Sequence, residues 1–199
     1  MRVLMTSALL AGALLVAGPA GAAANLVANP GFETGDFSGW IVTVGGSGSD
    51  VDLGVDQYAA DVDSGSWGAF LGNADTSAIT QVIATTPGAT YRVSFELDVY
   101  QSQAFDGGLS VSLGGHPVVT LVEPAETDSF VEYSAVVTAS AGASQLVFSG
   151  SDPGGWFGLD DVSVTQLSSP IPEPTTGALA IAGLALVAGA ARRRSRRGD

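Results

Sequence analysis

The side chains of this chain that could do chemistry are aromatic rings, amides and carboxylates. A sugar ring has an apolar face and a rim of hydroxyl groups, so a surface that binds sugars needs an aromatic platform with polar groups beside it. Tyr100 falls on the polar face of a predicted strand, directly before Gln101, whose amide could bond to hydroxyl groups. The candidate platform residues are Tyr58, Trp67, Tyr100, Phe105 and Trp156.

Each of these aromatic residues also has a structural interpretation. Large aromatic side chains are common in protein cores, so spacing alone does not assign them to a ligand. Trp67 could be a core residue at the start of a strand, and Trp156 could cap the edge of a folded domain. Both interpretations stay open for these positions.

Residues for catalysis are scarce. The chain has no cysteine and one histidine, His116, which lies between Gly115 and Pro117 in a predicted hairpin turn. No G-x-S-x-G nucleophile motif and no phosphate-binding glycine motif is present. Carboxylate pairs are abundant in so acidic a chain and therefore decide nothing, unless two face each other across a cleft at glycosidase spacing. We predict that the protein is not an enzyme, with a glycan-active enzyme as the less favoured alternative.

The charge distribution restricts the partners. The formal net charge is −13 and the chain has no lysine. Between residues 25 and 170 there are 18 acidic residues and a single arginine, Arg92. Such a surface repels nucleic acid and anionic lipid headgroups, and it favours cations and neutral partners. We therefore expect no nucleic-acid partner.

The elements that must position these residues are β-strands. In residues 91–100 apolar and polar residues alternate strictly, which is typical of a strand with one buried face. Further strands are predicted at 39–44, 68–72, 78–85, 109–113, 118–122, 130–138, 145–149 and 157–165, with glycine- and proline-rich turns between them. No 3.6-residue period is sustained, so we predict an all-β, two-sheet antiparallel sandwich, with jelly-roll topology favoured. Residues 45–65 are expected to form a long loop or a weak edge hairpin.

The N-terminal 24 residues are typical of a secretory signal peptide. Arg2 supplies the positive charge, residues 8–17 are apolar, and Ala22-Ala23-Ala24 offers a cleavage site before Asn25. The alternative, an N-terminal membrane anchor, is disfavoured because the apolar stretch is short. Export also permits disulfides, but without cysteine none can form.

The C-terminal segment combines three features in a fixed order. Pro172-Glu173-Pro174 is extended because proline lacks an N–H and restricts its neighbour. Residues 175–191 are almost uncharged, and their apolar part from 177 to 191 would form a helix of roughly 22 Å, short for a bilayer core of about 30 Å. Five arginines follow and would hold this end in the cytoplasm: Arg192, Arg193, Arg194, Arg196 and Arg197. A plain C-terminal anchor would also explain this pattern.

Tripeptide, apolar span and arginine cluster together resemble the PEP-CTERM sorting signal of Gram-negative bacteria. The resemblance covers residues 169–199, and Pro172, Glu173 and Pro174 match the name motif. It implies processing by an exosortase, a membrane transpeptidase, after a transient stage in the inner membrane through a C-terminal hydrophobic helix. The protein would then reach the cell surface, the outer membrane or the extracellular matrix.

The domain between these signals, residues 25–168, shows a second resemblance. The segments Asn29-Pro30-Gly31-Phe32-Glu33 and Leu159-Asp160-Asp161-Val162 resemble the first and last strands of galactose-binding-like jelly rolls, a group that includes many carbohydrate-binding modules. The resemblance implies a jelly-roll fold and a non-catalytic role in binding carbohydrate, specifically exopolysaccharide, or in adhesion. The alternative is a structural matrix protein without a ligand of its own.

The same resemblance implies a structural calcium ion where the first and last strands meet. By motif position its ligands would be Glu33 and either Asp160 or Asp161, with backbone carbonyls such as that of Gly31. Alternatively, Glu33 faces solvent and the aspartate pair straddles the sheet, with one side chain bonded to a loop. Residues 61–65 begin like a helix-loop calcium site, but the twelfth position is Gly72 instead of glutamate, so that site is rejected.

Overall fold

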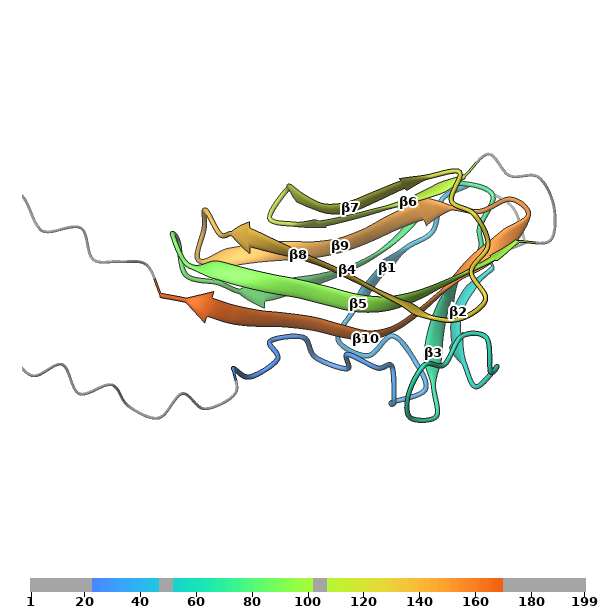
Figure 1. The fold of residues 1–199 in the computed structure, drawn as a ribbon, viewed down its shortest axis with the longest axis horizontal. Helices are drawn as coiled ribbons and strands as arrows, with labels where there is room; N and C mark the ends of the chain where they lie inside the picture. The colour runs from blue at the N-terminus through green and yellow to red at the C-terminus, as the bar shows by residue number, and fades with distance from the viewer. Residues whose placement is uncertain (1–22, 47–51, 102–106, 170–199) are drawn as a thin grey trace, which may run out of the picture.

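The computed structural model describes residues 23–46, 52–101 and 107–169, and every regular element in these stretches is a β-strand (Figure 1). The all-β prediction is therefore confirmed. The predicted signal peptide up to residue 22, the tripeptide Pro172-Glu173-Pro174, the apolar span 175–191 and the arginine cluster lie outside the described residues. None of the described stretches forms a helix of the length and hydrophobicity that a bilayer crossing requires.

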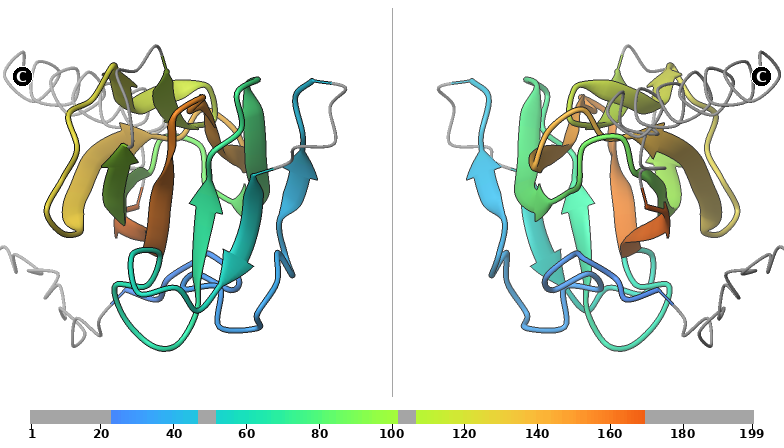
Figure 2. Two further views of the ribbon diagram at one scale, coloured as in Figure 1. Left: turned by 90° about the vertical axis from the view of Figure 1, so that its right-hand side faces the viewer. Right: turned by 90° about the vertical axis from the view of Figure 1, so that its left-hand side faces the viewer.

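The strands form two five-stranded antiparallel sheets that pack face to face (Figures 1 and 2). The first sheet has the order β1 (Ile41–Thr43), β4 (Ser77–Ala84), β9 (Ala143–Ser151), β6 (Gly108–Leu113) and β7 (His116–Val122). The second has the order β2 (Leu53–Asp56), β3 (Gly68–Leu71), β10 (Gly155–Ser168), β5 (Thr90–Gln101) and β8 (Val131–Thr138). Sequence neighbours are often separated in the sheets, which gives the jelly-roll connectivity.

The core lies between the two sheets and follows from the alternation in the strands. In β5 the apolar residues of the alternating pattern are each at most 1% exposed, and their polar neighbours face outward. Phe95 of β5 meets Phe148 of β9 edge to face at 5.1 Å, and Phe148 meets Trp40 at 6.0 Å. Because Phe95 and Phe148 belong to different sheets, this aromatic contact joins the two layers.

The described part of the region predicted as a long loop or weak edge hairpin contains strand β2. Strand β2 pairs with β3 at the edge of the second sheet, so the hairpin alternative applies. The connection between them, residues 57–67, lies against the outer face of the sheet at Ala60 and Asp61, whereas residues 57–59 and 63–66 are exposed. It can lie this close because glycines stand beneath it: a Cβ at Gly68 would overlap the Asp61 carbonyl oxygen, and one at Gly158 would lie 2.7 Å from the Ala60 oxygen.

The residues before β1 complete the second sheet beside β10. The amide of Leu26 donates to the Val164 oxygen, and the Asn25 side chain bonds to the backbone of Val162 and Val164. Further along, the Val162 amide donates to the oxygen of Pro30. This segment and loop 57–67 lie side by side at one side of the sandwich in Figure 2, and this arrangement brings residues 31–33 beside the middle of β10.

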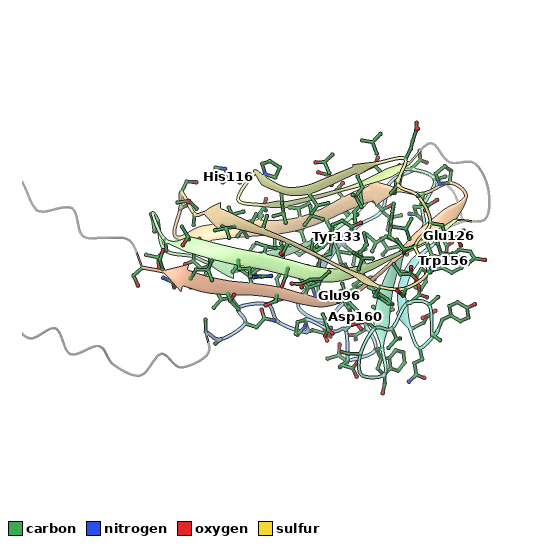
Figure 3. The ribbon with its side chains drawn as sticks, in the orientation of Figure 1. Glu96, His116, Glu126, Tyr133, Trp156 and Asp160 are labelled. Carbon is green, nitrogen blue, oxygen red and sulfur yellow. The ribbon has the colours of Figure 1, made fainter. Side chains whose placement is uncertain are left out.

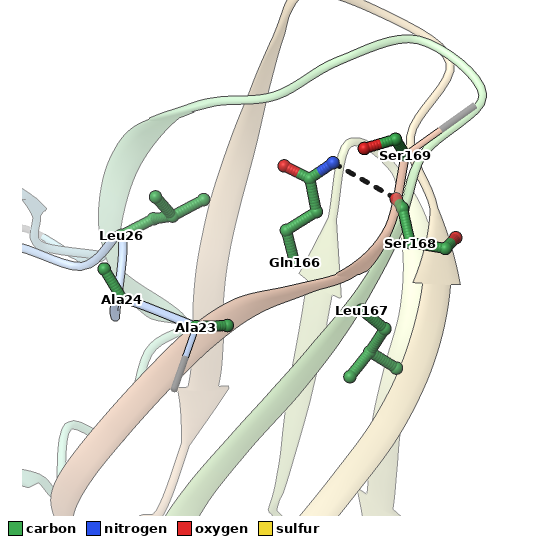
Figure 4. Close-up of a pocket in the computed structure, with 7 residues that line it drawn as sticks. All are labelled: Ala23, Ala24, Leu26, Gln166, Leu167, Ser168 and Ser169. Carbon is green, nitrogen blue, oxygen red and sulfur yellow. Dashed lines mark hydrogen bonds between the residues drawn. The ribbon is translucent and has the colours of Figure 1, made fainter. Parts of the chain in front are cut away.

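The described chain begins and ends at the same end of the sandwich. Ala23, Ala24 and Leu26 share a hollow of about 350 Å³ with the last three residues of β10 and with Ser169, which follows it (Figure 4). Within this hollow the Gln166 amide donates to the Ser168 oxygen. Residues 23 and 169, the two ends of the described chain, therefore both lie toward the left of Figure 1.

Candidate functional site

Three of the predicted platform aromatics come together at the other end of the sandwich. Trp156 is the second residue of β10 and pairs with Tyr100 of β5, and their rings stack with centroids 4.0 Å apart at 22°. Tyr58 approaches Trp156 edge to face at 6.3 Å. Tyr58 and Tyr100 are 58% and 37% exposed, so this aromatic cluster of Tyr58, Tyr100 and Trp156 is open to solvent. Trp156 lies at the right-hand end of the molecule in Figure 3.

A buried carboxyl group fixes the orientation of the central ring. The Trp156 indole N–H donates to Asp61 Oδ1 at 2.7 Å, although the two residues are 95 positions apart. Asp61 is 3% exposed, and burial, followed by the negative charge of Asp56, raises its pKa to about 7. Local bonds shape its loop: the Tyr58 amide donates to Asp56 Oδ1 and the Asp61 amide to the Tyr58 oxygen.

A cavity of about 180 Å³ opens beside the aromatic cluster. It is lined by three carboxylates and three aromatic rings: Asp52, Asp56, Asp61, Tyr58, Phe70 and Trp156. Sequence reasoning missed Phe70 and the three aspartates as site residues. Phe70 lies in the strand predicted at residues 68–72, and residues 45–65 gave no periodic signal. Only the folding of loop 57–67 over β3 and β10 places them together.

The remaining sugar-binding predictions lie elsewhere or are not described. Trp67 is separate from the aromatic cluster, because its ring packs over Gly35, whose added Cβ would lie 3.1 Å from it. The backbone of Gln101 pairs with Gly155 at the end of β5, next to the aromatic cluster, but its side chain lies outside the described set. Phe105 is also outside the described residues. The binding roles of these three residues stay predictions.

The four predicted calcium residues are brought together by the fold. A Cβ built on Gly31 would lie 3.2 Å from Asp160 Oδ1, 3.7 Å from Asp161 Oδ1 and 3.8 Å from Glu33 Cγ. Asp161 has a positive φ of 49° at a bulge in β10, and Asp160 has no exposed surface. The absence of a side chain at Gly31 therefore leaves space beside the carboxylates of Asp160 and Asp161, with the Glu33 side chain next to it.

The carboxylates of Asp160 and Glu33 bind loop 57–67. Asp160 Oδ2 accepts the amides of Asp63 and Ser64 at 2.9 and 3.0 Å, and Asp160 Oδ1 accepts that of Asp161 at 2.7 Å. Glu33 Oε1 accepts the amides of Ser66 and Trp67. Burial raises the pKa of Asp160 to about 6. The exposure of Glu33 and the bonding of Asp160 to a loop are features of the alternative without calcium, whereas the gathering of Gly31, Glu33, Asp160 and Asp161 is what the calcium interpretation requires.

The metal-ligand and catalytic possibilities can be judged from the same geometry. Within residues 23–46, 52–101 and 107–169 no three His, Asp or Glu side chains are arranged to hold a metal by themselves. A cation between Gly31 and Asp160 would therefore need backbone oxygens in addition, which suits the six to eight oxygen ligands of calcium. His116 begins β7 and lies far from Trp156, at the other end of the molecule in Figure 3. It cannot serve the aromatic cavity.

Comparison with known protein families identifies the C-terminal segment. Residues 170–197 match the family described as the PEP-CTERM protein-sorting motif. This range includes Pro172, Glu173, Pro174 and all five arginines of the terminal cluster. The motif indicates an exported protein with a C-terminal sorting signal. No curated protein is similar enough to the whole sequence to count as a relative.

Solved structures resemble the described sandwich. TmCBM61, solved in complex with β-1,4-galactotriose, has 22% identity and a TM-score of 0.54, and the match covers 72% of this chain and 99% of that one. A family 16 carbohydrate-binding module has 16% identity and a TM-score of 0.51, with coverage of 71% and 99%. The enzymatically active domain of bacteriophage CBA120 tailspike protein 4 has 17% identity and a TM-score of 0.53, with coverage of 72% and 21%.

These likenesses establish the fold of the domain. Sequence identities this low do not transfer a ligand or an activity, and the fold itself supports many functions. The chain therefore carries a PEP-CTERM sorting motif at residues 170–197, attached to a jelly-roll sandwich of the kind found in carbohydrate-binding modules.

Proposed function

We propose that this is an exported, non-catalytic carbohydrate-binding protein that holds polysaccharide at the aromatic cluster. The observation that carries the proposal is the stacked pair Trp156 and Tyr100, exposed beside a cavity that Tyr58 also lines. Exposed rings with carboxylates beside them offer an apolar platform for a sugar ring and acceptors for its hydroxyl groups. An exposed aromatic cavity of this kind is not expected of a matrix protein that has no ligand.

The position of the aromatic cluster suits a protein that is sorted through its C-terminal segment. The described chain ends at residue 169 at one end of the sandwich, and Trp156 lies at the other. A chain held through its tail at a membrane or cell surface would present the aromatic cluster outward. We infer that an exosortase of a Gram-negative host processes the tail, and that the ligand is the exopolysaccharide around the cell.

Binding to polysaccharide tests the main proposal. The full-length protein, kept in a polyoxyethylene detergent that has no sugar headgroup, would be titrated with the host's exopolysaccharide and with a panel of neutral glycans. We expect Trp156→Ala and Tyr100→Ala each to weaken binding at least tenfold, about 1.4 kcal/mol. Val136→Ala, an exposed position on β8 of the same sheet, is the control and should bind as the parent does. Binding that survives both aromatic substitutions would exclude the aromatic cluster as the site.

Processing is tested separately by the mass of the mature protein. If both signals act, the protein isolated from its host begins near Asn25 and lacks the arginine cluster. A cleaved N-terminus with an intact C-terminus would instead support the plain anchor. An intact chain in the cytosol would overturn export altogether.

We also propose that calcium binds where Gly31, Glu33 and Asp160 meet, with Asp161 contributing from the bulge in β10. Support comes from the space that Gly31 leaves beside Asp160 Oδ1 and from the crowding of acidic groups there. The pKa of Glu96, which pairs with Asp160, is raised first by burial and then by the negative charges of Asp63, Glu132, Asp161 and Asp160. A cation would relieve this repulsion and tie the two ends of the domain together.

The calcium proposal predicts stabilisation that depends on Glu33. A ligand that binds only the folded state at a hundred times its dissociation constant adds about 2.7 kcal/mol. We expect calcium to raise the melting temperature of the parent and of Glu126→Gln, an exposed control, and to have little effect on Glu33→Gln. The side-chain carbonyl of the introduced glutamine could still accept the loop amides, so loss of the calcium response would reflect lost charge. An equal response in all three proteins would contradict the proposal.

A further inference from the structure

The cavity beside the aromatic cluster is strongly acidic and contains no described positive group. Three of its six lining residues are aspartates: Asp52, Asp56 and Asp61. Arg92, the single arginine between residues 25 and 170, is bonded to Glu132 and Ser134 farther along the sheet. Among the described residues there is thus no arginine or lysine that neutralises the cavity, so a ligand with a positive charge would find carboxylates that no positively charged side chain pairs with.

The aromatic faces add a second, independent attraction for a cation. Trp156 and Tyr58 both line the cavity, and Trp156 is the best of the side chains for holding a cation over a ring face. The same rings offer an apolar platform for the carbons of a pyranose. A ligand that carries both a sugar ring and an ammonium group would use the rings and the carboxylates together, whereas a simple cation would use only part of the site.

Asp61 is the carboxyl group that connects the acidic cavity with the aromatic cluster. It is 3% exposed, it lines the cavity, and its Oδ1 is held by the Trp156 indole. The charged groups around it are all negative: Asp56 and Asp98 act on it directly, and Asp52 also lines the cavity. Tyr58 is the other titratable group that faces the cavity. Burial near these negative charges favours the protonated form of Asp61. A cation bound in the cavity would favour the ionised form, so its binding would release the proton.

The size of the cavity indicates how much of a glycan enters. A volume of about 180 Å³ is below the roughly 300–1,000 Å³ of pockets for drug-sized ligands. One sugar ring is therefore a better occupant than a long stretch of chain, and the exposed faces of Tyr58 and Tyr100 remain outside for neighbouring sugars.

We propose that the cavity lined by Asp56, Asp61 and Trp156 selects glycans that carry a free amino group, namely amino sugars without an N-acetyl cap. This inference rests on the proposed function and specifies its ligand. The ammonium group lies against the aspartates while the sugar ring packs on the aromatic cluster. An N-acetyl group has no charge to offer the aspartates, and a hydroxyl group makes only a neutral hydrogen bond, which is roughly half as strong as a charge-assisted one.

Three tetrasaccharides that differ only at carbon 2 test this directly. They are the β-1,4-linked tetramers of glucosamine, N-acetylglucosamine and glucose, titrated by calorimetry into the full-length protein in polyoxyethylene detergent at pH 6. We expect the glucosamine tetramer to bind at least tenfold more tightly than the other two. Tetralysine at the same charge is the control for general attraction to an acidic protein, and it should bind more weakly than the glucosamine tetramer.

Proton release on binding distinguishes contact with Asp61 from general electrostatic attraction to an acidic protein, which would release no proton. With the pKa of Asp61 at about 7, the group is mostly protonated at pH 6, so binding should release up to one proton. Buffers of different ionisation enthalpy measure that release. Asp61→Asn should abolish it and weaken binding of the glucosamine tetramer at least tenfold. Asp128→Asn, an exposed aspartate that does not line the cavity, should change neither quantity.

The outcomes separate this inference from the proposed function. If the glucose or N-acetylglucosamine tetramer binds as tightly as the glucosamine tetramer, and Trp156→Ala abolishes that binding, the selectivity is wrong but carbohydrate binding stands. Tetralysine binding as tightly as the glucosamine tetramer would also overturn the selectivity. If none of the tetramers binds, the amino-sugar inference fails, and the polysaccharide titration alone decides the proposed function.

Discussion

Two buried aspartates on the outer side of the same sheet have different surroundings. Asp160 lies in β10 and accepts three backbone amides, and its pKa is raised to about 6. Asp61 lies in the loop above β10, accepts the Trp156 indole, and has its pKa raised to about 7. Burial is the main cause in both cases. The difference lies in the hydrogen-bond partners: backbone amides hold Asp160 in a structural role, whereas Asp61 lines a cavity that a ligand could enter.

Replacing each aspartate by asparagine should produce the largest contrast. Both carboxylate oxygens of Asp160 accept backbone N–H groups, so in either orientation the NH₂ of asparagine would face at least one of these donors. We therefore expect Asp160→Asn to lose about 3 kcal/mol of unfolding free energy. Asp61→Asn keeps an acceptor for the indole and removes a buried charge, so its loss should be below about 1 kcal/mol. Denaturant unfolding at pH 7.5 measures both. Equal losses would mean that the two groups have the same structural role.

The pH dependence of stability should separate Asp61 from the rest of the domain. A carboxyl group with a folded pKa above its unfolded value stabilises the fold at low pH, and that contribution is lost as the pH rises through the folded pKa. Between pH 5 and pH 8 we expect the parent to lose on the order of 2 kcal/mol more than Asp61→Asn, because Asp61 ionises near pH 7. The measurement is the difference in unfolding free energy between the two proteins across that range. Parallel curves would show that Asp61 ionises as easily in the folded chain as in the unfolded one.

A substitution beneath the loop should disturb Asp61 and leave the Asp160 contacts in place. At Gly158 an added Cβ would lie 2.7 Å from the backbone oxygen of Ala60, so Gly158→Ala must displace that part of loop 57–67. We expect a loss of about 1–2 kcal/mol of stability and a larger proportional loss of glycan affinity. Gly115→Ala is the control for stability alone, because its added Cβ meets nothing within 4 Å, although its φ of 79° strains alanine. Unchanged glycan affinity in Gly158→Ala would separate the loop from the binding site.

The smallest effect is expected at the ion pair between Arg92 and Glu132. Both side chains are about half exposed, at 49% and 52%, and the closest atoms are 3.1 Å apart. Solvent screens such a pair, so Arg92→Gln should cost less than about 0.5 kcal/mol and should leave both aspartate sites unchanged. Thermal unfolding at low and high salt provides the measurement. A loss above about 1 kcal/mol would mean that the pair has a structural role that its exposure does not suggest.

Most of the sandwich could be predicted from local pattern, and most of the cavity could not. The alternation in residues 91–100 predicts β5, because a strand with one buried face repeats every two residues. The expected strands at 68–72 and 78–85 correspond closely to β3 and β4. Strand β2 lies in a glycine- and aspartate-rich stretch without such a pattern. It forms because β3 offers an open edge, which no local signal reports.

The candidate sites divide in the same way. Resemblance of the first and last motifs predicted that Gly31, Glu33, Asp160 and Asp161 would meet, and the fold does bring them together. The spacing of Tyr58, Tyr100 and Trp156 in the sequence did not predict that these three residues would form a cluster. It also did not predict that Trp67 would lie apart from them. Asp61 gave no usable signal, because its burial depends on glycines 68 and 158, which lie on two other strands.

The sequence by itself determined the sorting motif, the acidic charge and the alternation that makes the strands, because each of these is written in consecutive residues. The tertiary structure alone decided which aromatic rings share a surface and which aspartates are buried, because these depend on how loop 57–67 packs against β3 and β10. A ring and a carboxyl group 95 residues apart, Trp156 and Asp61, become hydrogen-bond partners only when the sheet forms beneath them.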